Sequence, residues 1–203
     1  MTTKTIVPEA VKPGDDTRRT RILERAKQVF LAYGFQRTTM DDIARAAEVS
    51  RPALYLLFRN KTDIYRALAS GFLDDLLAQA RDGLKKDAPL ADRLFSVVGG
   101  ALEKTLEIEA SPHGAEILDM RTSLAADIVE DCRAKFHELV CGAIAGEARR
   151  RGIDLSRGST PASLLTDMLL DAIDGMRLRE LPATRQLAAT RGYIAIIDQL
   201  LSR

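Results

Sequence analysis

The sequence contains few of the residues from which catalytic and metal sites are usually built. Among 203 residues there are two histidines, two cysteines and no tryptophan. His113 and Glu116 are spaced to share one face of a helix, but two ligands make a poor metal site. The sequence also lacks a glycine-rich phosphate loop and a convincing nucleophile constellation. We therefore predict no catalytic residues, no metal and no cofactor.

Disulfide pairing and membrane insertion are not indicated either. Cys132 and Cys141 are nine residues apart, which places them on opposite faces of one helix and predicts buried free thiols. No apolar run approaches the roughly 20 residues that a membrane span needs. The first residues are polar and lack the apolar core of a signal peptide, so we expect a cytoplasmic protein without a membrane partner.

Charge is nearly balanced over the chain but unevenly distributed along it. The formal net charge is +1. Residues 1–66 carry 13 Lys and Arg against 8 Asp and Glu, a net charge of +5, whereas residues 67–203 carry 17 against 21, a net charge of −4. A basic N-terminal part suits phosphate binding, but an excess of this size does not establish nucleic-acid binding by itself.

Apolar residues recur at helical spacing along most of the chain, and strand-like alternation does not stand out. The predicted fold class is all-α, with about nine helices. Residues 1–16, with two prolines and a glycine, are expected to form a flexible arm. This arm either has no role, or Lys4 and Lys12 reach along a DNA backbone together with the arginine cluster Arg18, Arg19 and Arg21. We call residues 17–66 the N-terminal domain and residues 67–203 the C-terminal domain. Helices are expected at about 17–33, 39–47, 50–57, 60–86, 90–108, 113–121, 124–151, 162–179 and 183–202.

Residues 38–61 contain two short amphipathic helices separated by a tight turn at Glu48 and Val49. Thr39 followed by Asp42 indicates a capping box at the start of the first helix. In the second helix Ser50 is a favoured N-cap, and a proline at position 52 falls in the first turn, where its missing N–H costs little. This pattern is typical of a helix-turn-helix, a shape suited to a DNA groove.

Several residues of this unit are expected to face outward. Arg51 and Tyr55 lie on the polar side of the second short helix, and an arginine at a helix start can bind guanine through two hydrogen bonds. Lys61 begins the next helix, where a cation opposes the helix dipole unless a phosphate binds beside it. The alternatives are an ordinary surface arginine and a solvated lysine.

Residues 17–66 resemble the tetracycline-repressor (TetR) family of dimeric bacterial transcription regulators. The resemblance rests on the types and spacing of Thr39, Ser50, Pro52, Tyr55 and Lys61, together with neighbouring apolar positions. It implies a three-helix DNA-binding domain whose third helix, at about residues 50–57, reads the major groove. It also implies a larger helical domain that binds a ligand and dimerises through its last two helices.

Carried over by position, the resemblance implies DNA-binding roles for six residues. Thr39 would cap its helix and contact a phosphate, Ser50 would place the recognition helix, Arg51 and Pro52 would approach base edges, Tyr55 would touch the backbone or a base, and Lys61 would grip a phosphate. Two positions depart from the family pattern. Glu48 stands where a glycine is frequent, which implies backbone strain, and Leu57 stands where histidine or tyrosine often precedes the phenylalanine, so that contact is not carried over.

The C-terminal domain offers candidate ligand and dimer residues without separating them from core residues. Gly99 and Gly100 fall within a predicted helix, which indicates a kink or a close helix contact. The run 149–151 of three arginines is interpreted as a solvated helix end. Ligand candidates, which are equally compatible with a plain core, are Phe72, Leu76, Phe95, Val98, Leu102, Met120, Phe136 and Met168, with Arg121 and His137 as polar partners. The last two helices are apolar nearly all round, which predicts a second-subunit contact involving Leu169, Ile173, Met176, Tyr193, Ile196, Ile197 and Leu200.

The hypothesis that follows is a homodimeric transcriptional repressor that responds to a small-molecule effector of unknown identity. Its partners would be a pseudo-palindromic double-stranded DNA operator and a second copy of itself. One alternative is a DNA-binding helical protein controlled by protein partners without an inducer. A helical enzyme is the remaining alternative, and the scarcity of catalytic residue types argues against it.

Overall fold

The computed structural model describes residues 13–155 and 160–202, without the side chains of residues 13–15, 121 and 122. The described residues are helical with short connections and contain no strand, so the all-α prediction is confirmed. The elements are α1 (Pro13–Tyr33), α2 (Met40–Ala46), α3 (Arg51–Leu57), α4 (Lys61–Leu84), α5 (Leu90–Leu94), a π-helical turn η1 (Phe95–Gly99), α6 (Gly100–Glu109), α7 (Gly114–Asp119), α8 (Arg121–Leu124), α9 (Ala126–Arg150), α10 (Ala162–Leu178) and α11 (Ala183–Leu200).

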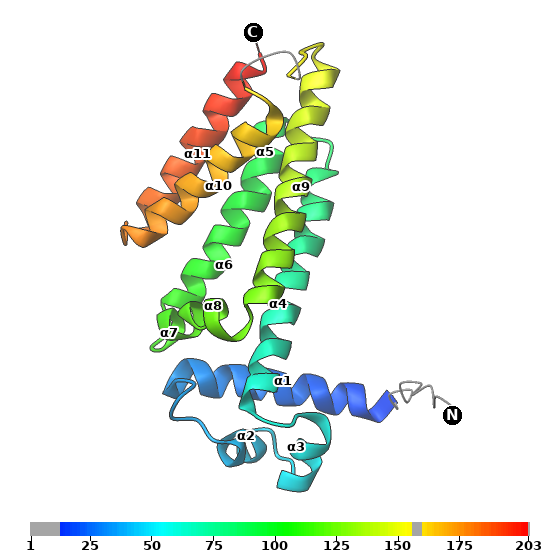
Figure 1. Cartoon of the computed structure of the whole chain (residues 1–203), viewed down its shortest axis with the longest axis vertical. Helices are drawn as coiled ribbons and strands as arrows, with labels where there is room; N and C mark the ends of the chain where they lie inside the picture. Colours follow the sequence, from blue (N-terminus) through cyan, green and yellow to red (C-terminus); the bar gives the residue numbers. More distant parts are fainter. Residues whose placement is uncertain (1–12, 156–159, 203) are drawn as a thin grey trace, which may run out of the picture.

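The helices form two parts that share α4 (Figure 1). Helices α1, α2 and α3 lie at one end, with α1 running across the base of α4. Helix α4 then runs into the C-terminal domain, where it packs along α9, and α10 packs between α9 and α11. The described end of α11 lies at the opposite end of the molecule from α2 and α3. No helix among the described residues is long and apolar enough to cross a membrane.

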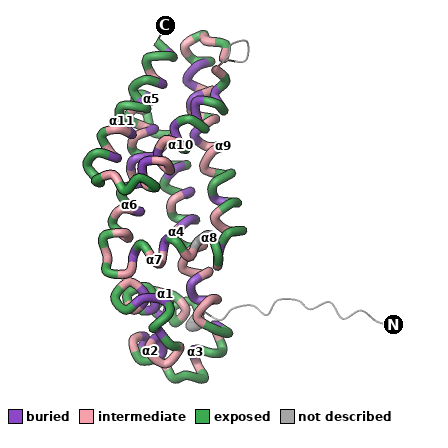
Figure 2. Tube along the Cα trace, turned by 60° about the vertical axis from the view of Figure 1, so that its left-hand side comes forward, coloured by how far each residue is buried: buried purple, intermediate pink, exposed green. Residues whose placement is uncertain are grey.

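Each part has its own apolar core (Figure 2). The core of the N-terminal domain joins all four of its helices, with Ile22, Phe30, Ile43, Leu54 and Ile64 each at most 1% exposed. Gly34 ends α1 with a φ of +82°, a conformation that glycine adopts without strain. A Cβ at Gly34 would also lie 2.9 Å from the Glu116 carboxylate, so this turn packs directly against the C-terminal domain.

Two polar contacts fix α4 to the helices above the N-terminal domain. The Tyr65 hydroxyl donates to the Ile117 carbonyl at 2.7 Å. The Arg66 guanidinium donates to both carboxylate oxygens of Asp127, at 2.8 and 2.6 Å, and the hydrogen bonding from Arg66 lowers the pKa of Asp127 to about 2. The base of α4 is therefore tied to α7 and to the start of α9.

Three boundaries differ from the sequence expectation. Helix α1 begins at Pro13, so the predicted arm is wrong for residues 13–16; a proline suits the first helical position, where the N–H is not needed. The rest of the arm, with Lys4 and Lys12, lies outside the described residues. The helix expected at 90–108 contains the π-helical turn, and the one expected at 113–121 is two short helices, α7 and α8.

The π-helical turn confirms the close contact expected at the paired glycines. A Cβ at Gly99 would lie 3.0 Å from the Phe95 ring, so a side chain there would displace the aromatic ring. Gly100 has open space around it. Of the two glycines, only Gly99 lies in a tight contact, and this contact is with the Phe95 ring of the same helical segment.

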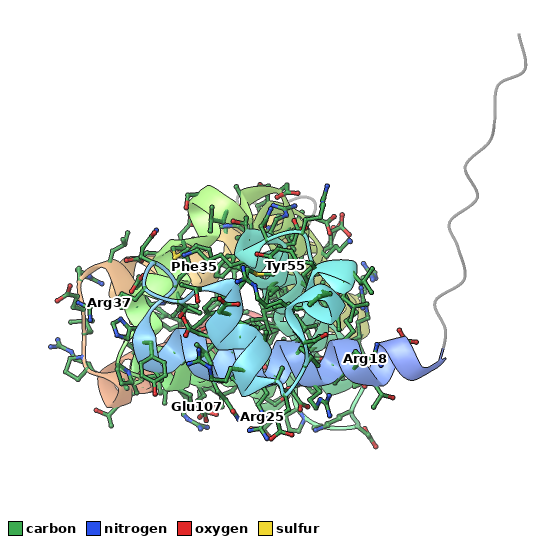
Figure 3. All side chains as sticks on the ribbon, turned by 90° about the horizontal axis from the view of Figure 1, so that it is seen from below. Arg18, Arg25, Phe35, Arg37, Tyr55 and Glu107 are labelled. Carbon is green, nitrogen blue, oxygen red and sulfur yellow. The ribbon has the colours of Figure 1, made fainter. Side chains whose placement is uncertain are left out.

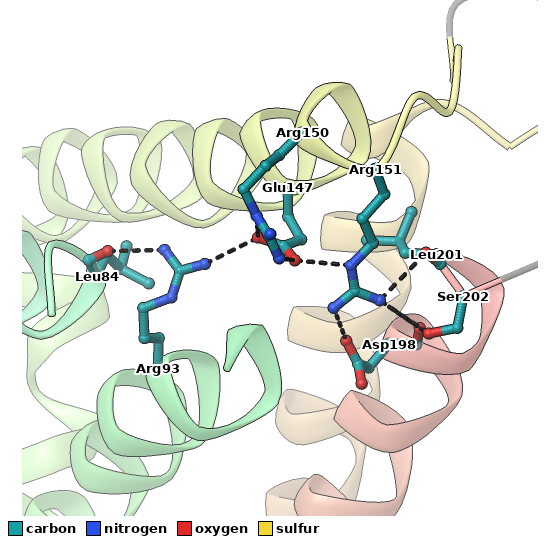
Figure 4. Close-up of polar contacts among 8 residues, drawn as sticks. All are labelled: Leu84, Arg93, Glu147, Arg150, Arg151, Asp198, Leu201 and Ser202. Carbon is teal, nitrogen blue, oxygen red and sulfur yellow. Dashed lines mark hydrogen bonds and ion pairs between the residues drawn. The ribbon is translucent and has the colours of Figure 1, made fainter. Parts of the chain in front are cut away.

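A buried carboxylate joins α5, α9 and α11 at the far end of the C-terminal domain (Figure 4). The Glu147 side chain is only 2% exposed and accepts hydrogen bonds from Arg93 at 3.2 Å, from Arg151 at 2.7 Å and from Arg150. Arg151 also donates to Asp198 on α11 at 2.8 Å. The solvated helix end expected for the arginine run is therefore wrong for Arg151, which is 23% exposed and internally paired.

The cysteines lie as the helical spacing indicated, although only one of them is buried. Cys132 is 8% exposed and packs between α4 and α9, whereas Cys141 is half-buried. The two form no disulfide with each other in the described part of the chain.

Candidate nucleic-acid interface

The predicted caps hold α2 and α3 at the tip of the N-terminal domain. The Thr39 backbone N–H and hydroxyl donate to the Asp42 carboxylate at 3.0 and 2.7 Å, and the Asp42 N–H donates back to the hydroxyl at 3.2 Å. These hydrogen bonds lower the pKa of Asp42. Ser50 accepts from the Ala53 N–H at 3.3 Å, and Pro52 occupies the first turn of α3. The capping roles of Thr39 and Ser50 are confirmed.

The turn between α2 and α3 has the strained geometry expected from the missing glycine. Glu48 has a φ of +55°, a region that residues other than glycine seldom adopt. The Val49 N–H donates to the Ala44 carbonyl at 3.0 Å, and the Val49 side chain packs on the domain core. These contacts hold the backbone in the turn, leaving the Glu48 side chain exposed.

The outer face of α3 is polar and accessible. Arg51 and Pro52 are exposed, and Tyr55 is 44% exposed, while Leu54 between them is fully buried. Figure 3 looks onto this end of the molecule, with Tyr55 on one of the two short helices and arginines such as Arg18 and Arg37 spread across the same end. The structure therefore brings the predicted α3 residues together on one surface.

Arg51 forms an ion pair with Asp41 of α2, a partner that the sequence analysis did not identify. Its Nη1 donates to Asp41 Oδ2 at 2.9 Å, and its Nε lies 2.8 Å from Asp41 Oδ1. Both side chains remain accessible, with 61% and 44% exposure. This partner was missed because it lies ten residues away, across the turn.

Two further groups lie at this end: Arg19, which the sequence offered as a possible contact to the DNA backbone, and Leu56, which it did not identify. The Arg19 guanidinium lies 4.6 Å from the centroid of the Phe58 ring, which places a cation of α1 beside the end of α3. Leu56 is 84% exposed, an unusual position for leucine next to a recognition surface. The only sequence signal for the exposure of Leu56 was that it lies off the inner apolar face formed by Leu54 and Phe58.

Lys61, to which the family resemblance gives a phosphate contact, is engaged within the chain itself. Its ammonium donates to the carbonyls of Phe35, Gln36 and Thr38 at 2.8, 3.2 and 3.2 Å and lies 4.5 Å from the centroid of the Phe35 ring. An ammonium has three N–H donors, and these three carbonyls engage all of them. In the free chain the Lys61 side chain therefore holds the α1–α2 loop, and its contact to a phosphate stays a prediction.

Replacing Lys61 by methionine tests this role, because methionine keeps the apolar stem and removes the ammonium. We expect the free energy of unfolding to fall by about 1–2 kcal/mol, since charged hydrogen bonds to three carbonyls are lost. The salt dependence of DNA binding should not change. Chemical denaturation and binding titrations at several salt concentrations measure both quantities. Unchanged stability with a weaker salt dependence would instead support the phosphate contact.

A cavity of about 340 Å³ lies in the C-terminal domain between α4, α6, α9 and α10. Four predicted ligand residues line it: Leu76, Val98, Leu102 and Phe136. Lining residues that the sequence did not identify as ligand candidates are Leu73, Ala101, Thr105, Val129, Cys132, Arg133, Leu170, Asp174 and Arg177. Their spacing is the ordinary spacing of a helical core, so no sequence signal separates them from buried packing.

The other ligand candidates lie elsewhere. Phe72 lines a separate cavity of about 320 Å³ where α1 meets α4 and α7. Phe95 packs on the main core with Arg191 3.7 Å from its ring centroid, and Met120 packs on the N-terminal core. His137 pairs with Asp167 at 2.9 Å, and Met168 is 61% exposed. The Arg121 side chain lies outside the described residues.

The predicted dimer residues divide into two groups. Leu169, Ile173, Met176 and Ile197 are at most 9% exposed and belong to the core of the chain itself, so their assignment to a subunit contact is corrected; Ile173 also lines the 340 Å³ cavity. Tyr193, Ile196 and Leu200 on α11 are 37%, 56% and 40% exposed. Together with Leu164 and Met168 on α10, which are 39% and 61% exposed, they form what we call the α10–α11 apolar stripe.

Comparison with known proteins assigns the N-terminal fold to a family. Residues 22–68 match the model of "Bacterial regulatory proteins, tetR family", and this segment contains α2, α3 and the caps described above. The match places the DNA-binding part of the chain, residues 22–68, in the tetR family. The relatives that the chain matches are transcriptional regulators, which agrees with the prediction of a regulator instead of an enzyme.

Relatives of the tetR family match different lengths of the chain. The HTH-type transcriptional activator FasR of Mycolicibacterium smegmatis is 35% identical over 83 residues, 41% of this chain and 38% of FasR. The HTH-type transcriptional regulator TtgR of Pseudomonas putida is 29% identical over 186 residues, 91% of this chain and 79% of TtgR. The chain spans about half or less of the length of several curated relatives that it matches.

A solved structure matches the fold over nearly the whole chain. The fatty acid degradation regulator FadR from Bacillus halodurans superposes with a TM-score of 0.62 and 17% identity, covering 95% of this chain and 96% of FadR. At this identity the comparison supports the arrangement of the helices only. The Lys61 contacts and the Asp41–Arg51 pair are features of this tetR-family chain that the comparison does not supply.

Proposed function

We propose that this chain is a DNA-binding transcriptional repressor that acts as a homodimer and is released from its operator by a small apolar molecule. The observation that carries the proposal is the capped α2–turn–α3 unit, which exposes Arg51 and Tyr55 on one surface. A helix of this kind fits the major groove with its N-terminal residues against base edges. Arg51 stands at the first helical position of α3, where such a contact is made.

The α10–α11 apolar stripe supports the homodimer. Its residues repeat at intervals of four on α10 and of three and four on α11, which places them on one face of each helix. Two copies of α10 and α11 packed through these stripes would form a four-helix interface with two-fold symmetry. Two α3 helices about 34–36 Å apart would then read two half-sites of a pseudo-palindrome.

The 340 Å³ cavity supports an effector and indicates its chemistry. Its size is near the lower end of small-molecule sites, and most of its lining is apolar. Arg177 already pairs with Glu109 at 2.6 Å, and Arg133 pairs with Asp174 at 2.9 Å. Because both cations are neutralised, the cavity offers little net charge to an anionic ligand, and we propose a neutral, apolar effector.

Helix α4 supplies the connection between cavity and DNA. It lines the cavity through Leu73 and Leu76 and also carries Tyr65 and Arg66, which tie its base to α7 and α9. A ligand that prefers one arrangement of the C-terminal helices shifts the population toward it. We propose that this shift moves the two α3 helices out of register with the DNA.

The experiment is a selection of genomic fragments by the purified chain, repeated with a panel of neutral apolar molecules. Enrichment of a pseudo-palindromic sequence, lost on addition of a panel member, supports the proposal. The relatives include a named activator, FasR, and a named repressor, KstR2 of Rhodococcus jostii. A reporter gene placed behind the selected site therefore tests whether this protein represses or activates transcription. Failure of the selection to enrich any fragment would contradict operator binding.

Replacing Arg51 by alanine tests the base contact. We expect discrimination between the selected operator and a variant at the contacted base pair to fall by about 1–3 kcal/mol, roughly tenfold or more. Binding titrations on the two duplexes measure it. Arg25→Ala, which removes an exposed arginine of α1, is the matched control and should leave the discrimination unchanged. An equal loss of affinity on operator and scrambled DNA would contradict base reading by Arg51.

A further inference from the structure

The Asp41–Arg51 pair joins the two helices of the DNA-binding unit at its exposed surface. Asp41 lies in the first turn of α2 and Arg51 in the first turn of α3. Both oxygens of the carboxylate are within 2.9 Å of a guanidinium nitrogen. Exposed ion pairs contribute little to folding stability, so the pair is not needed to hold the domain core together.

We propose that Asp41 is a positioning residue that makes Arg51 specific for guanine and keeps it from binding phosphate. The inference rests on the proposed DNA-binding function and assigns a source to its specificity. A guanidinium has five N–H donors in one plane. The Asp41 carboxylate accepts a hydrogen bond from Nη1 and lies 2.8 Å from Nε. This leaves the two donors of Nη2 unused by Asp41 and restricts the orientation of the plane.

An oriented guanidinium suits guanine for a geometric reason. Guanine presents O6 and N7 side by side in the major groove, and arginine binds them through two parallel hydrogen bonds. A free arginine side chain loses rotamer freedom when it binds. Because Asp41 already restricts the Arg51 rotamers in the unbound chain, the loss of side-chain entropy on DNA binding is smaller.

The same carboxylate discriminates against phosphate. Arg51 and Asp41 together carry no net charge, so the pair gives no net neutralisation of a DNA phosphate and releases no counterion. A phosphate approaching Arg51 also meets the like charge of Asp41, whereas a guanine edge presents neutral acceptors. Asp41 should therefore lower non-specific affinity while it supports the specific contact.

The neighbouring carboxylates do not share this position. Asp42 accepts the hydrogen bonds of the Thr39 cap, and Glu48 lies in the turn, exposed and in the left-handed conformation. Glu48→Gln removes the same unit of charge from the same domain without touching Arg51. It is therefore the matched control for Asp41→Asn.

The test measures affinity for the selected operator and for scrambled DNA as a function of salt, for the wild-type chain and for Asp41→Asn. In Asp41→Asn we expect discrimination at the guanine to fall about three- to tenfold. The slope of log affinity against log salt should become steeper by about 0.9, because the released Arg51 binds one phosphate. Asp41→Glu keeps the carboxylate and should keep most of the discrimination, whereas Glu48→Gln should leave it unchanged.

Arg51→Ala separates this inference from the proposed function. In an Arg51→Ala background, Asp41→Asn should not reduce discrimination further, since Asp41 acts through Arg51. If Arg51→Ala relaxes the base preference and Asp41→Asn does not, the role of Asp41 is wrong and base reading by Arg51 stands. If Asp41→Asn binds the operator more tightly with full preference, the pair blocks Arg51 instead of orienting it. If Arg51→Ala changes no preference, base reading itself fails.

Discussion

Ile196→Glu is expected to convert the protein to a monomer and to lower its operator affinity by at least 100-fold. Ile196 lies within the α10–α11 apolar stripe and is 56% exposed in the single chain. At a two-fold interface each substitution appears twice, so two carboxylates would be buried against apolar partners and against each other. A monomer binds only one half-site and loses the high effective concentration of the second α3.

Sedimentation at micromolar concentration measures the assembly, and titration on the selected operator measures the affinity. Leu178→Glu is the matched control, because Leu178 is 86% exposed at the C-terminal end of α10 and lies outside the stripe. This variant should remain dimeric. A wild-type chain that sediments as a monomer would contradict the homodimer, and a dimeric Ile196→Glu variant would exclude this stripe as the interface.

Glu147→Gln is expected to lower the free energy of unfolding by about 3 kcal/mol, because it leaves the mostly buried Arg93 without a carboxylate partner in the described part of the chain and Arg151 with Asp198 alone. Arg93 and Arg151 are 18% and 23% exposed, so water replaces the carboxylate only in part. For a chain of this length the melting temperature should fall by about 6–12 °C. Glu138→Gln, on the exposed side of α9, is the control and should shift it by less than about 2 °C, as surface substitutions do.

The pH dependence gives an independent check on Glu147. Hydrogen bonding from Arg150 and then Arg151 lowers the pKa of Glu147 from 4.5 to about 2. A carboxyl whose pKa is lower in the folded state stabilises the fold above its unfolded pKa and loses this contribution as the pH falls. The stability difference between the wild type and Glu147→Gln should therefore be complete above about pH 4.5 and shrink toward pH 2. A difference independent of pH would contradict the charged role.

The sequence predicted those parts of the site that depend on neighbours along the chain. Thr39 with Asp42, and Ser50 with Pro52, are caps whose hydrogen bonds span three residues, so composition and spacing suffice. The strain at Glu48 followed in the same way from a turn that calls for a positive φ. Helical periodicity along the chain predicted the all-α fold class, and the spacing of the motif residues indicated the family; both are confirmed.

Contacts between distant segments were beyond this reasoning. Lys61 donates to carbonyls 23 to 26 residues earlier in the chain. These carbonyls lie in the α1–α2 loop, and the path of a loop produces no periodic pattern in the sequence. The sequence of the last two helices predicted that two faces of each are apolar. Periodicity does not tell which face packs inside the chain and which is exposed on its surface. Leu169 and Ile197 were therefore assigned to the wrong side, and Met168, which belongs to the stripe, was assigned to a pocket.

Helix α4 has a mechanical consequence because it is continuous from Lys61 to Leu84. At 1.5 Å per residue its 24 residues make a rod about 36 Å long. The last residue of α4 that lines the cavity, Leu76, is about 22 Å from Lys61 along the helix, so a tilt of about 8° there would carry the start of α4 through about 3 Å. Successive base pairs are about 3.4 Å apart along the DNA axis. In the proposed mechanism, a rotation of this size at the cavity would displace each α3 by nearly one base pair. Helix α4 would then act as a lever that converts a small change around the ligand into a loss of register with the operator.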